Sequence, residues 1–276
     1  MSIHVVGLGP GTLDRASGRA LRLLDDESTT VILRTIQHPA CEELASRRPV
    51  EACDDLYEAA DEHTDVYGGI VKRVLAAGAR GPVVYAVPGS PLVGETAVGL
   101  LRAAAEERDS EIEVLPAESF VDAALAVVGI DPLFDGLQVL DAQVLPHQLV
   151  LQVPTIIGHL TLGPLVDEVR HRLDVVLGPD AFVTVLTDLG TPEADSLEVA
   201  VSGLGHHHAG LRVSLFVPAQ PAGLLGAVAT MRRLRTECPW DAEQTHRSIL
   251  PNLVEETFEL YDALQAVGHD VPGDED

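Results

Sequence analysis

A glycine-rich loop near the N-terminus constrains this chain more than any other feature. The apolar run at residues 4–6 leads directly into Gly7-Leu8-Gly9-Pro10-Gly11. Such a run predicts the end of a buried strand. The glycines remove the Cβ atoms that would hold a ligand away, and Pro10 fixes one φ angle, so the loop is both bare and stiff. Apolar residues at helical spacing follow from 13 to 24, and the sequence therefore predicts a strand, a glycine loop and a helix.

The loop differs from the dinucleotide-binding fingerprint. Gly7 and Gly9 have the required spacing, but the third glycine of that pattern would fall at Thr12, and Pro10 has no place in it. Two interpretations remain at this point: a tight turn between a strand and a helix, or a loop that approaches a different nucleoside ligand.

Two later turns have a similar design. The apolar run 83–87 leads into Pro88-Gly89-Ser90-Pro91, and a strand at 113–116 leads into a helix that opens at 117–120. Another strand at 29–33 and helices at about 40–46, 67–75 and 92–107 complete a strand–helix alternation. This alternation predicts a parallel sheet with helices on its faces over residues 1–121. Ligands of such sheets bind beyond the carboxyl ends of the strands, where turns 7–11, 88–91 and 116–120 would gather. Three ordinary turns would give the same pattern, but three coordinated turns favour a ligand site.

The character of the sequence changes after Asp122. Strands are predicted at 137–140, 149–153, 182–186 and 211–216, with a helix at about 162–172, which indicates a second α/β lobe with a mixed sheet over residues 122–217. Two prolines and a glycine make residues 218–224 a linker, and residues 225–276 form a helical segment. The run His206-His207-His208 is open to interpretation as a metal cluster, but adjacent histidines point in different directions, which favours a polar loop.

The composition excludes several classes of protein. Among the 276 residues there is no run of about 18 apolar residues, so neither a membrane span nor a signal peptide is expected. The three cysteines (Cys41, Cys53 and Cys238) are widely spaced, which argues against a disulfide framework or a zinc site and favours a reducing, cytoplasmic location. A formal net charge of −25 repels polyanions, and so no nucleic-acid partner is expected.

Residues 1 to about 217 resemble the tetrapyrrole methylase family of S-adenosylmethionine-dependent enzymes, which includes porphyrin and corrin methylases and diphthine synthase. The segments that carry the resemblance are 5–11, 87–93 and 115–120. The resemblance implies two α/β lobes with S-adenosylmethionine and a small-molecule acceptor, such as a tetrapyrrole, between them. It also implies a homodimer. Methyl transfer needs mainly alignment and exclusion of water, so no catalytic residue is assigned.

The same resemblance implies which residues hold the cofactor. They lie in the three turns and, more loosely, in the second lobe: Leu8, Gly9, Pro10, Gly11, Pro88, Gly89, Ser90, Val93, Ser119, Phe120, Gln152 and Val153. One departure stands out. Many members of the family have Gly-Asp-Pro in the second turn, where this chain has Gly89-Ser90-Pro91, so a carboxylate is missing from the expected site.

Carboxylates cluster on a helix near the C-terminus. At about 100° per residue, Glu255, Glu259 and Asp262 fall within about 60° of one another with Glu256 beside them, while leucines occupy the opposite face. A solvated acidic face would give the same pattern. However, clustered carboxylates repel one another unless a cation lies among them, and clusters of oxygen ligands suit Mg²⁺.

The motif Cys-Pro-Trp-Asp-x-Glu-Gln-Thr-His at 238–246, followed by Glu-Glu-x-x-Glu, resembles the start of a MazG-type nucleoside triphosphate pyrophosphohydrolase. The resemblance implies Mg²⁺ held by Glu255, Glu256 and Glu259, with Asp262 as a helper, and nucleoside triphosphates split to monophosphate and pyrophosphate by a metal-activated water. That family has a later helix bearing Glu-x-x-Asp. The sequence reaches Asp276 before such a helix, so an incomplete magnesium site is expected.

Two functions follow from these resemblances. The first is an S-adenosylmethionine-dependent methyltransferase of unknown acceptor that carries an incomplete pyrophosphohydrolase segment. The alternative is a non-catalytic domain that binds S-adenosylmethionine or a related nucleoside and regulates or scaffolds a MazG-type pyrophosphohydrolase. Ser90 favours the second function, whereas the glycine loops favour the first.

Overall fold

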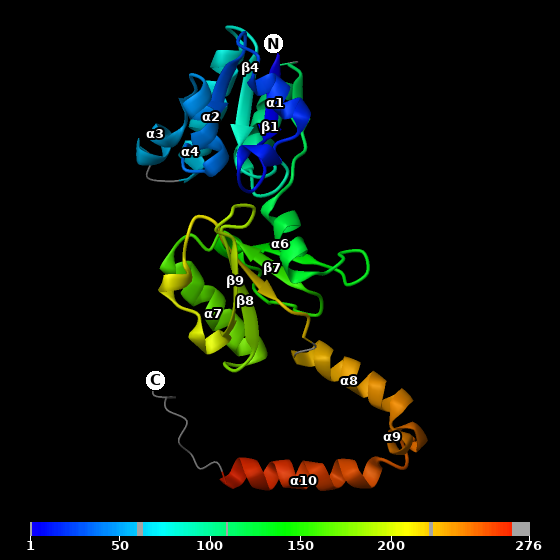
Figure 1. Cartoon of the computed structure of the whole chain (residues 1–276). Coiled ribbons are helices and arrows are strands. Elements are labelled where there is room, and N and C mark those ends of the chain that lie inside the picture. Colours follow the sequence, from blue (N-terminus) through cyan, green and yellow to red (C-terminus); the bar gives the residue numbers. More distant parts are fainter. Residues whose placement is uncertain (1, 60–62, 109, 221–222, 267–276) are drawn as a thin grey trace, which may run out of the picture. The chain divides into compact units, whose positions relative to one another are not determined.

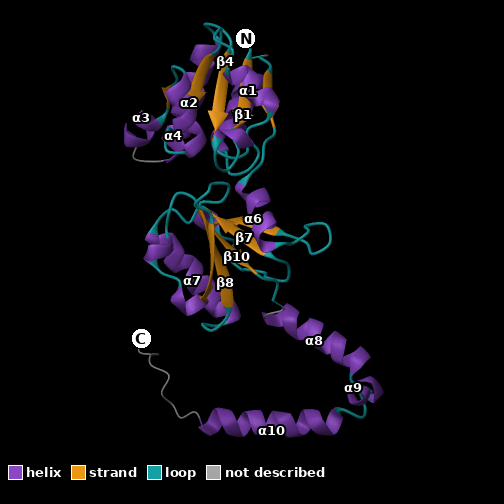
Figure 2. Ribbon diagram, viewed as in Figure 1, coloured by secondary structure: helices purple, strands orange, loops and turns teal. Residues whose placement is uncertain are grey.

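The computed structural model describes residues 2–59, 63–108, 110–220 and 223–266 (Figure 1). By its internal contacts the chain separates into two units, residues 1–220 and 221–276. The first unit contains two α/β lobes and the second contains helices (Figure 2). The fold class predicted from the sequence is therefore confirmed.

The N-terminal α/β lobe, which we call lobe one, is built on a five-stranded parallel sheet with the order β3-β2-β4-β1-β5. Its strands are β1 (Ile3–Gly7), β2 (Thr30–Leu33), β3 (Glu51–Ala52), β4 (Val83–Val87) and β5 (Ile112–Leu115). Every residue of β4 is buried. Parallel strands covered on both faces need this kind of continuous apolar sequence, and the valine-rich runs supply it.

Helices cover both faces of this sheet, so the carboxyl ends of its strands are the natural place for a ligand. The chain forms η1 (Leu13–Arg15), α1 (Gly18–Leu24), α2 (Pro39–Arg47), α3 (Asp54–Ala59), α4 (His63–Gly78) and α5 (Thr96–Glu106). Leu24 of α1 and Leu44 of α2 pack with Val6 on one face. On the other face, Ile70 of α4 and Leu101 of α5 pack with Val5.

Two predicted helices of lobe one differ from the structure. The segment 13–24 is divided into η1 and α1 by extended backbone at Ala16 and Ser17, where the Ser17 side chain caps α1. The helix predicted from Leu92 begins only at Thr96, because Gly94 adopts a left-handed φ of 70° and ends the preceding turn.

Lobe two contains a mixed sheet with the order β6-β7-β10-β8-β9. Its elements are α6 (Phe120–Val128), β6 (Gln138–Asp141), η2 (Ala142–Val144), β7 (Thr155–Gly158), α7 (Gly163–Leu177), β8 (Phe182–Thr187), β9 (Asp195–Ala200), η3 (Val201–Gly203), η4 (His206–His208) and β10 (Val213–Val217). Strands β6 and β7 are parallel, and the other neighbouring pairs are antiparallel. Val166 and Leu173 of α7 pack against Ile157 in its main core.

Two strand predictions in lobe two need correction. The apolar run 149–153 was predicted as a strand but lies in irregular backbone, and the strand β7 begins after Pro154. Leu149 and Leu151 are buried in the core, so burial rather than sheet pairing explains their apolar character. The sequence does not predict strand β9, because it is an edge strand with a mostly polar, exposed sequence.

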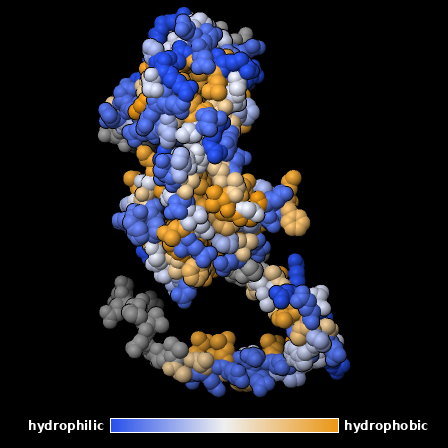
Figure 3. All heavy atoms as spheres, viewed as in Figure 1, coloured by the Kyte–Doolittle hydropathy of each residue, from blue (hydrophilic) through white to orange (hydrophobic). Residues whose placement is uncertain are grey.

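The second unit consists of α8 (Gly223–Glu237), α9 (Pro239–Glu243) and α10 (Leu250–Ala266). Figure 3 shows apolar side chains on the surface of α10. The large ones that are exposed on this helix are Leu250, Leu253, Val254, Phe258, Leu260, Tyr261 and Leu264. Within the described parts of both units, no helix combines the length and the apolarity that crossing a membrane requires.

Candidate functional site

The first two predicted turns are joined by backbone hydrogen bonds. Leu8 N–H donates to the Val87 carbonyl at 2.9 Å, which continues the pairing of β1 with β4. Gly9 and Gly89 then exchange two bonds, Gly9 N–H to Gly89 O at 3.1 Å and Gly89 N–H to Gly9 O at 2.8 Å. Both glycines have positive φ angles, +80° and +64°, which residues with a side chain rarely adopt.

All three turns meet at Gly7. A Cβ atom at this position would lie 2.4 Å from the Gly89 carbonyl oxygen, 2.5 Å from Ala117 Cβ and 2.8 Å from Pro91 Cδ. Only glycine allows this approach. The prediction that the turns gather at the carboxyl edge of the sheet is therefore confirmed by the packing around one residue.

The two serines of the predicted site hold the turns themselves. Ser90 is buried, and its Oγ accepts a hydrogen bond from Leu92 N–H at 3.3 Å. Ser119 caps α6 in a capping box: its Oγ accepts from Asp122 N–H, while the Asp122 carboxylate accepts from Ser119 N–H at 2.7 Å. The missing carboxylate at position 90 is thus replaced by a hydroxyl that stabilises its own turn.

One face of the second turn is open. No atom lies within 4 Å of a Cβ built on Gly89. Val93 and Phe120 are partly exposed, and the Phe120 ring reaches Gly158 in lobe two, 2.8 Å from a Cβ built there. A ligand can therefore approach the backbone of the second turn at Gly89.

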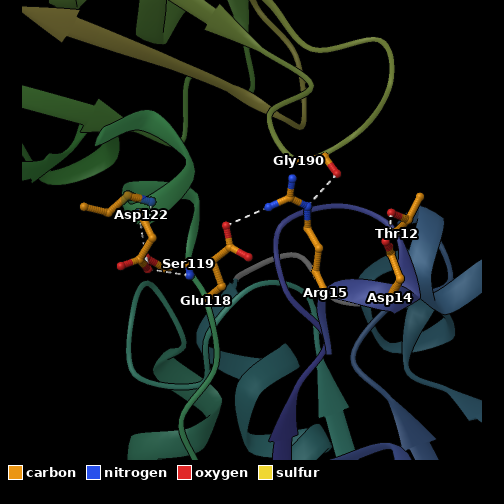
Figure 4. A network of polar contacts seen from close by, with 8 residues as sticks. Thr12, Asp14, Arg15, Glu118, Ser119, Asp122 and Gly190 are labelled. Atoms are coloured by element: carbon orange, nitrogen blue, oxygen red, sulfur yellow. Dashed lines mark hydrogen bonds and ion pairs between the residues drawn. The ribbon is translucent and has the colours of Figure 1, made fainter. Parts of the chain in front are cut away.

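Arg15 connects lobe one with lobe two, as Figure 4 shows. Its Nε donates to the Gly190 carbonyl at 3.0 Å, and its Nη1 pairs with Glu118 Oε1 at 2.8 Å. A Cβ atom on Gly11 would lie 1.8 Å from the same Gly190 oxygen, so lobe two packs directly on the glycine loop. The Gly190 contact could not be found from the sequence, since nothing there distinguishes it from other loop glycines.

A histidine–carboxylate pair in lobe two lies against the second turn. His159 follows β7 and has a φ of +60°, which is uncommon for a residue with a side chain. Its Nδ1 lies 2.9 Å from Asp141 Oδ2, and its Cε1 lies 3.0 Å from a Cβ built on Gly94. No local sequence pattern predicts this pair, because Asp141 ends β6 and His159 follows β7.

A buried ion pair lies at the carboxyl edge of the sheet in lobe one. Arg34, immediately after β2, donates to Glu95 Oε1 at 2.7 Å, and the Glu95 side chain is only 2% exposed. Arg34 Nε also donates to the Tyr57 hydroxyl at 3.2 Å. Burial raises the pKa of Glu95 to about 7, against the opposing effect of Arg34. The position of Arg34 directly after a predicted strand was the available signal for a residue at this edge.

The structure does not bring every predicted residue to this site. Gln152 is exposed and Val153 packs beside Gly136, at the end of β7 opposite to Gly158. The candidate magnesium ligands Glu255, Glu256, Glu259 and Asp262 are exposed on α10. Among the described residues, no three histidine, cysteine or acidic side chains are arranged to hold a metal, and His206 instead pairs with Asp167 at 2.5 Å.

Comparison with known proteins identifies the family and the fold. The family model for Tetrapyrrole (Corrin/Porphyrin) Methylases matches residues 2–152, more than half of the chain. The chain belongs to this family. A solved structure of uroporphyrin-III-C-methyltransferase from Thermus thermophilus is 19% identical with a TM-score of 0.56, covering 89% of this chain and 98% of that one. Diphthine synthase, at 14% identity and a TM-score of 0.58, covers 83% and 94%. At these identities the two structures show a shared fold.

Two further relatives of this tetrapyrrole methylase family member extend the comparison. The uncharacterized protein YabN of Bacillus subtilis (strain 168) is 33% identical over 273 residues, 95% of this chain and 55% of YabN. The chain therefore spans about half the length of that relative. The nucleoside triphosphate pyrophosphohydrolase of Mycolicibacterium smegmatis is 54% identical over 43 residues, 16% of this chain and 13% of that protein. The chain thus has a partial similarity to MazG-type pyrophosphohydrolases.

Proposed function

We propose that this protein is an S-adenosylmethionine-dependent methyltransferase. The observation that carries the proposal is the paired Gly9–Gly89 backbone with open space above Gly89, at the carboxyl edge of a parallel sheet. A uroporphyrin-III C-methyltransferase of the same fold was solved with S-adenosyl homocysteine bound, at 16% identity and a TM-score of 0.57. When bound, the cofactor would supply the methyl group to be transferred.

The chain's own residues would bind the cofactor, orient it toward the acceptor and exclude water from the site. The turn from Gly89 to Val93 would lie beside the ligand, because a Cβ built on Gly89 meets open space and Leu92 is exposed. His159, paired with Asp141, lies against Gly94 just after this turn, and Phe120 contacts the neighbouring Gly158. Both side chains would limit the access of water. Alignment of the donor with its acceptor in a dry site provides most of the acceleration that a methyl transfer requires.

Ser90 makes this site less acidic than the Gly-Asp-Pro version. Since its hydroxyl is already used by Leu92 N–H, it contributes turn geometry rather than a charge. We expect cofactor binding to depend on backbone groups and shape. We also propose that the methyl acceptor is a small molecule, that the protein forms a homodimer and that it is cytoplasmic.

Calorimetric titration with S-adenosylmethionine and S-adenosyl homocysteine tests the proposal. The natural chain should bind both with micromolar affinity, and Gly89→Leu should lose at least tenfold because its side chain fills the open space. Gly129→Leu is a matched control, since Gly129 also has a positive φ (+70°) and open surroundings but lies at the end of α6. Absence of binding by the folded natural chain would contradict the proposal, as would equal losses in both variants.

The similarity to pyrophosphohydrolases supports one alternative function, a nucleoside-binding domain that regulates or scaffolds such an enzyme. The two functions differ in turnover. A methyltransferase would convert S-adenosylmethionine to S-adenosyl homocysteine once an acceptor is present. A scaffold would bind without conversion and would change pyrophosphate release by a MazG-type enzyme added to the same assay.

A further inference from the structure

Asp141 and His159 of lobe two have the geometry of a base and the carboxylate that orients it. Asp141 ends β6, and its Oδ2 lies 2.9 Å from Nδ1 of His159, the residue after β7. Its other oxygen, Oδ1, accepts a hydrogen bond from Gln143 N–H at 2.9 Å, so the carboxylate is held at both oxygens. An imidazole that donates its Nδ1 proton to a carboxylate keeps a lone pair on Nε2, and this nitrogen can accept a proton.

The second ring nitrogen of His159, Nε2, is open to a ligand. The side chain is 34% exposed, and no residue in the described part of the chain bonds to Nε2. The polar atoms that are both enclosed and without a partner belong to other described residues, so Nε2 has access to solvent. The ring edge that carries Nε2 faces the end of the second turn: Nε2 and Cε1 lie 3.2 Å and 3.0 Å from a Cβ built on Gly94.

The backbone of His159 is held in an uncommon conformation. Its φ of +60° is rare for a residue with a side chain, and such conformations cluster at functional sites. A glycine would adopt this φ without strain. It would lose the contacts of the ring with Asp141 and Gly94, so the histidine at this position is explained by its side chain and not by its backbone.

We propose that His159 is the general base for the methyl acceptor. This inference rests on the proposed methyltransferase function, and it narrows the acceptor to a molecule that carries a proton on the atom to be methylated, such as an amine, a hydroxyl group or an acidic C–H group. The base stands beside the second turn, because Gly94 directly follows Val93, one of the predicted cofactor residues.

In this step His159 removes the one proton that the acceptor must lose. The acceptor atom forms a bond to the methyl carbon, the electron pair of the broken carbon–sulfur bond stays on sulfur, and the acceptor's proton passes to Nε2. Asp141 stabilises the imidazolium that results. His159 is kept neutral beside the positive sulfonium of S-adenosylmethionine, and it can hold a proton beside the uncharged sulfur of S-adenosyl homocysteine.

This charge difference provides the first test. The natural chain would be titrated with both ligands by calorimetry at about pH 8 and about pH 5.5, which span the range in which histidine changes its charge. The affinity ratio of S-adenosylmethionine to S-adenosyl homocysteine should fall by about fivefold or more at the lower pH, because protonated His159 repels the sulfonium. Glu95, which is paired with Arg34 next to Gly94 and has a pKa of about 7, titrates in the same range. A His159 variant is therefore needed to separate the two groups.

Three variants assign the effect to His159. In His159→Asn the ratio should change by less than about twofold, and asparagine tolerates the left-handed backbone. His171→Asn makes the same substitution at an exposed position of α7 and should behave like the natural chain. Asp141→Asn can still accept from Gln143 N–H but lacks the charge that stabilises the imidazolium, so the fall should move to lower pH.

Acylation by diethyl pyrocarbonate gives a second readout that requires no turnover. The reagent attacks neutral imidazole nitrogens, and peptide mass analysis locates the product. S-adenosyl homocysteine at about ten times its Kd should slow acylation of His159 by about tenfold, since occupied sites are shielded. Acylation of the exposed His171 should be unchanged.

The outcomes separate this inference from the proposed function. If neither ligand binds to the folded natural chain, the methyltransferase proposal fails and the role of His159 fails with it. If both ligands bind but the ratio falls equally in the natural chain and in His159→Asn, only the inference about His159 is overturned. Acylation of His159 at the same rate with and without bound S-adenosyl homocysteine would overturn that inference as well.

Discussion

The turns of lobe one and the acidic helix α10 show how differently two predicted sites are realised. In lobe one, Gly7, Gly9 and Ser90 are buried, and backbone hydrogen bonds fix the positions of their turns. On α10, Glu255 and Glu259 are exposed, as are the leucines of the opposite face. The first site has its own supporting structure within the chain, whereas the second consists of one helix face.

The two motifs differ in whether the fold of the described chain brings the other parts of the site to them. The turns follow strands that pair with one another, so forming the sheet also brings the turns together. A magnesium site on α10 needs oxygen ligands from more than one direction, and a helix face supplies only one side of such a shell. A sequence motif therefore predicts a site more reliably when the other segments that complete the site can be recognised in the same sequence.

The largest effect is expected at Gly7, where the three turns meet. Gly7→Val should lower the free energy of unfolding by about 4 to 5 kcal/mol, because its side chain would enter the space of Gly89 and Ala117. Urea unfolding measures this loss. Gly68→Ala is the control: nothing lies near a Cβ there, and the change should stabilise α4 by about 0.5 kcal/mol. A tolerated valine at position 7 would mean that the turns are not held as described.

The buried ion pair should give the next largest effect. Arg34→Met leaves the Glu95 carboxylate buried without its partner, which should cost about 3 to 4 kcal/mol in a urea unfolding experiment at pH 8. Arg102→Met replaces an exposed arginine of α5 and should change the stability by less than about 0.5 kcal/mol. Equal losses in the two variants would show that the Arg34–Glu95 contact is not a buried pair.

The buried imidazole of His38 predicts a pH dependence with a definite sign. Burial lowers its pKa from 6.5 to about 4, so its contribution to stability is present above pH 6.5 and is lost as the pH falls from 6.5 to 4. The natural chain should lose about 3 kcal/mol more over this window than His38→Phe. Parallel pH profiles of unfolding, with His171→Phe as the control, would measure the difference. Identical profiles for the natural chain and His38→Phe would contradict this account.

The smallest effect is expected on α10, whose large apolar side chains are exposed. Phe258→Ala removes a side chain that is 65% exposed, so the free energy of unfolding should change by less than about 0.5 kcal/mol. Leu33→Ala, in a fully buried position of β2, should cost about 2 to 4 kcal/mol in the same assay. A loss of similar size at Phe258 would show that α10 is packed rather than exposed.

The sequence was most informative where the constraint was local. The glycines of turns 7–11 and 88–91 indicated backbone segments that come close together, because close approach and left-handed backbone leave few alternatives to glycine. The alternation of apolar runs with helical segments predicted a parallel sheet with helices on its faces. Family resemblance supplied the arrangement of the two lobes.

The sequence was least informative where two distant segments had to be matched. Arg34 with Glu95 and His159 with Asp141 depend on which strands become neighbours, and no local pattern encodes that choice. The apolar run 149–153 was misassigned for a related reason. Burial in an irregular segment requires the same residue types as burial in a strand. The apolar residues Leu149 and Leu151 therefore do not distinguish a strand from a buried irregular segment.

Hydrogen exchange with and without S-adenosyl homocysteine tests most directly the claim that the three turns of lobe one form the cofactor site. Bound S-adenosyl homocysteine should slow amide exchange in the segments 7–15, 88–95 and 117–122, while α10 should exchange at an unchanged rate. Protection of α10 without protection of these turns, or the absence of any ligand-dependent change, would contradict it.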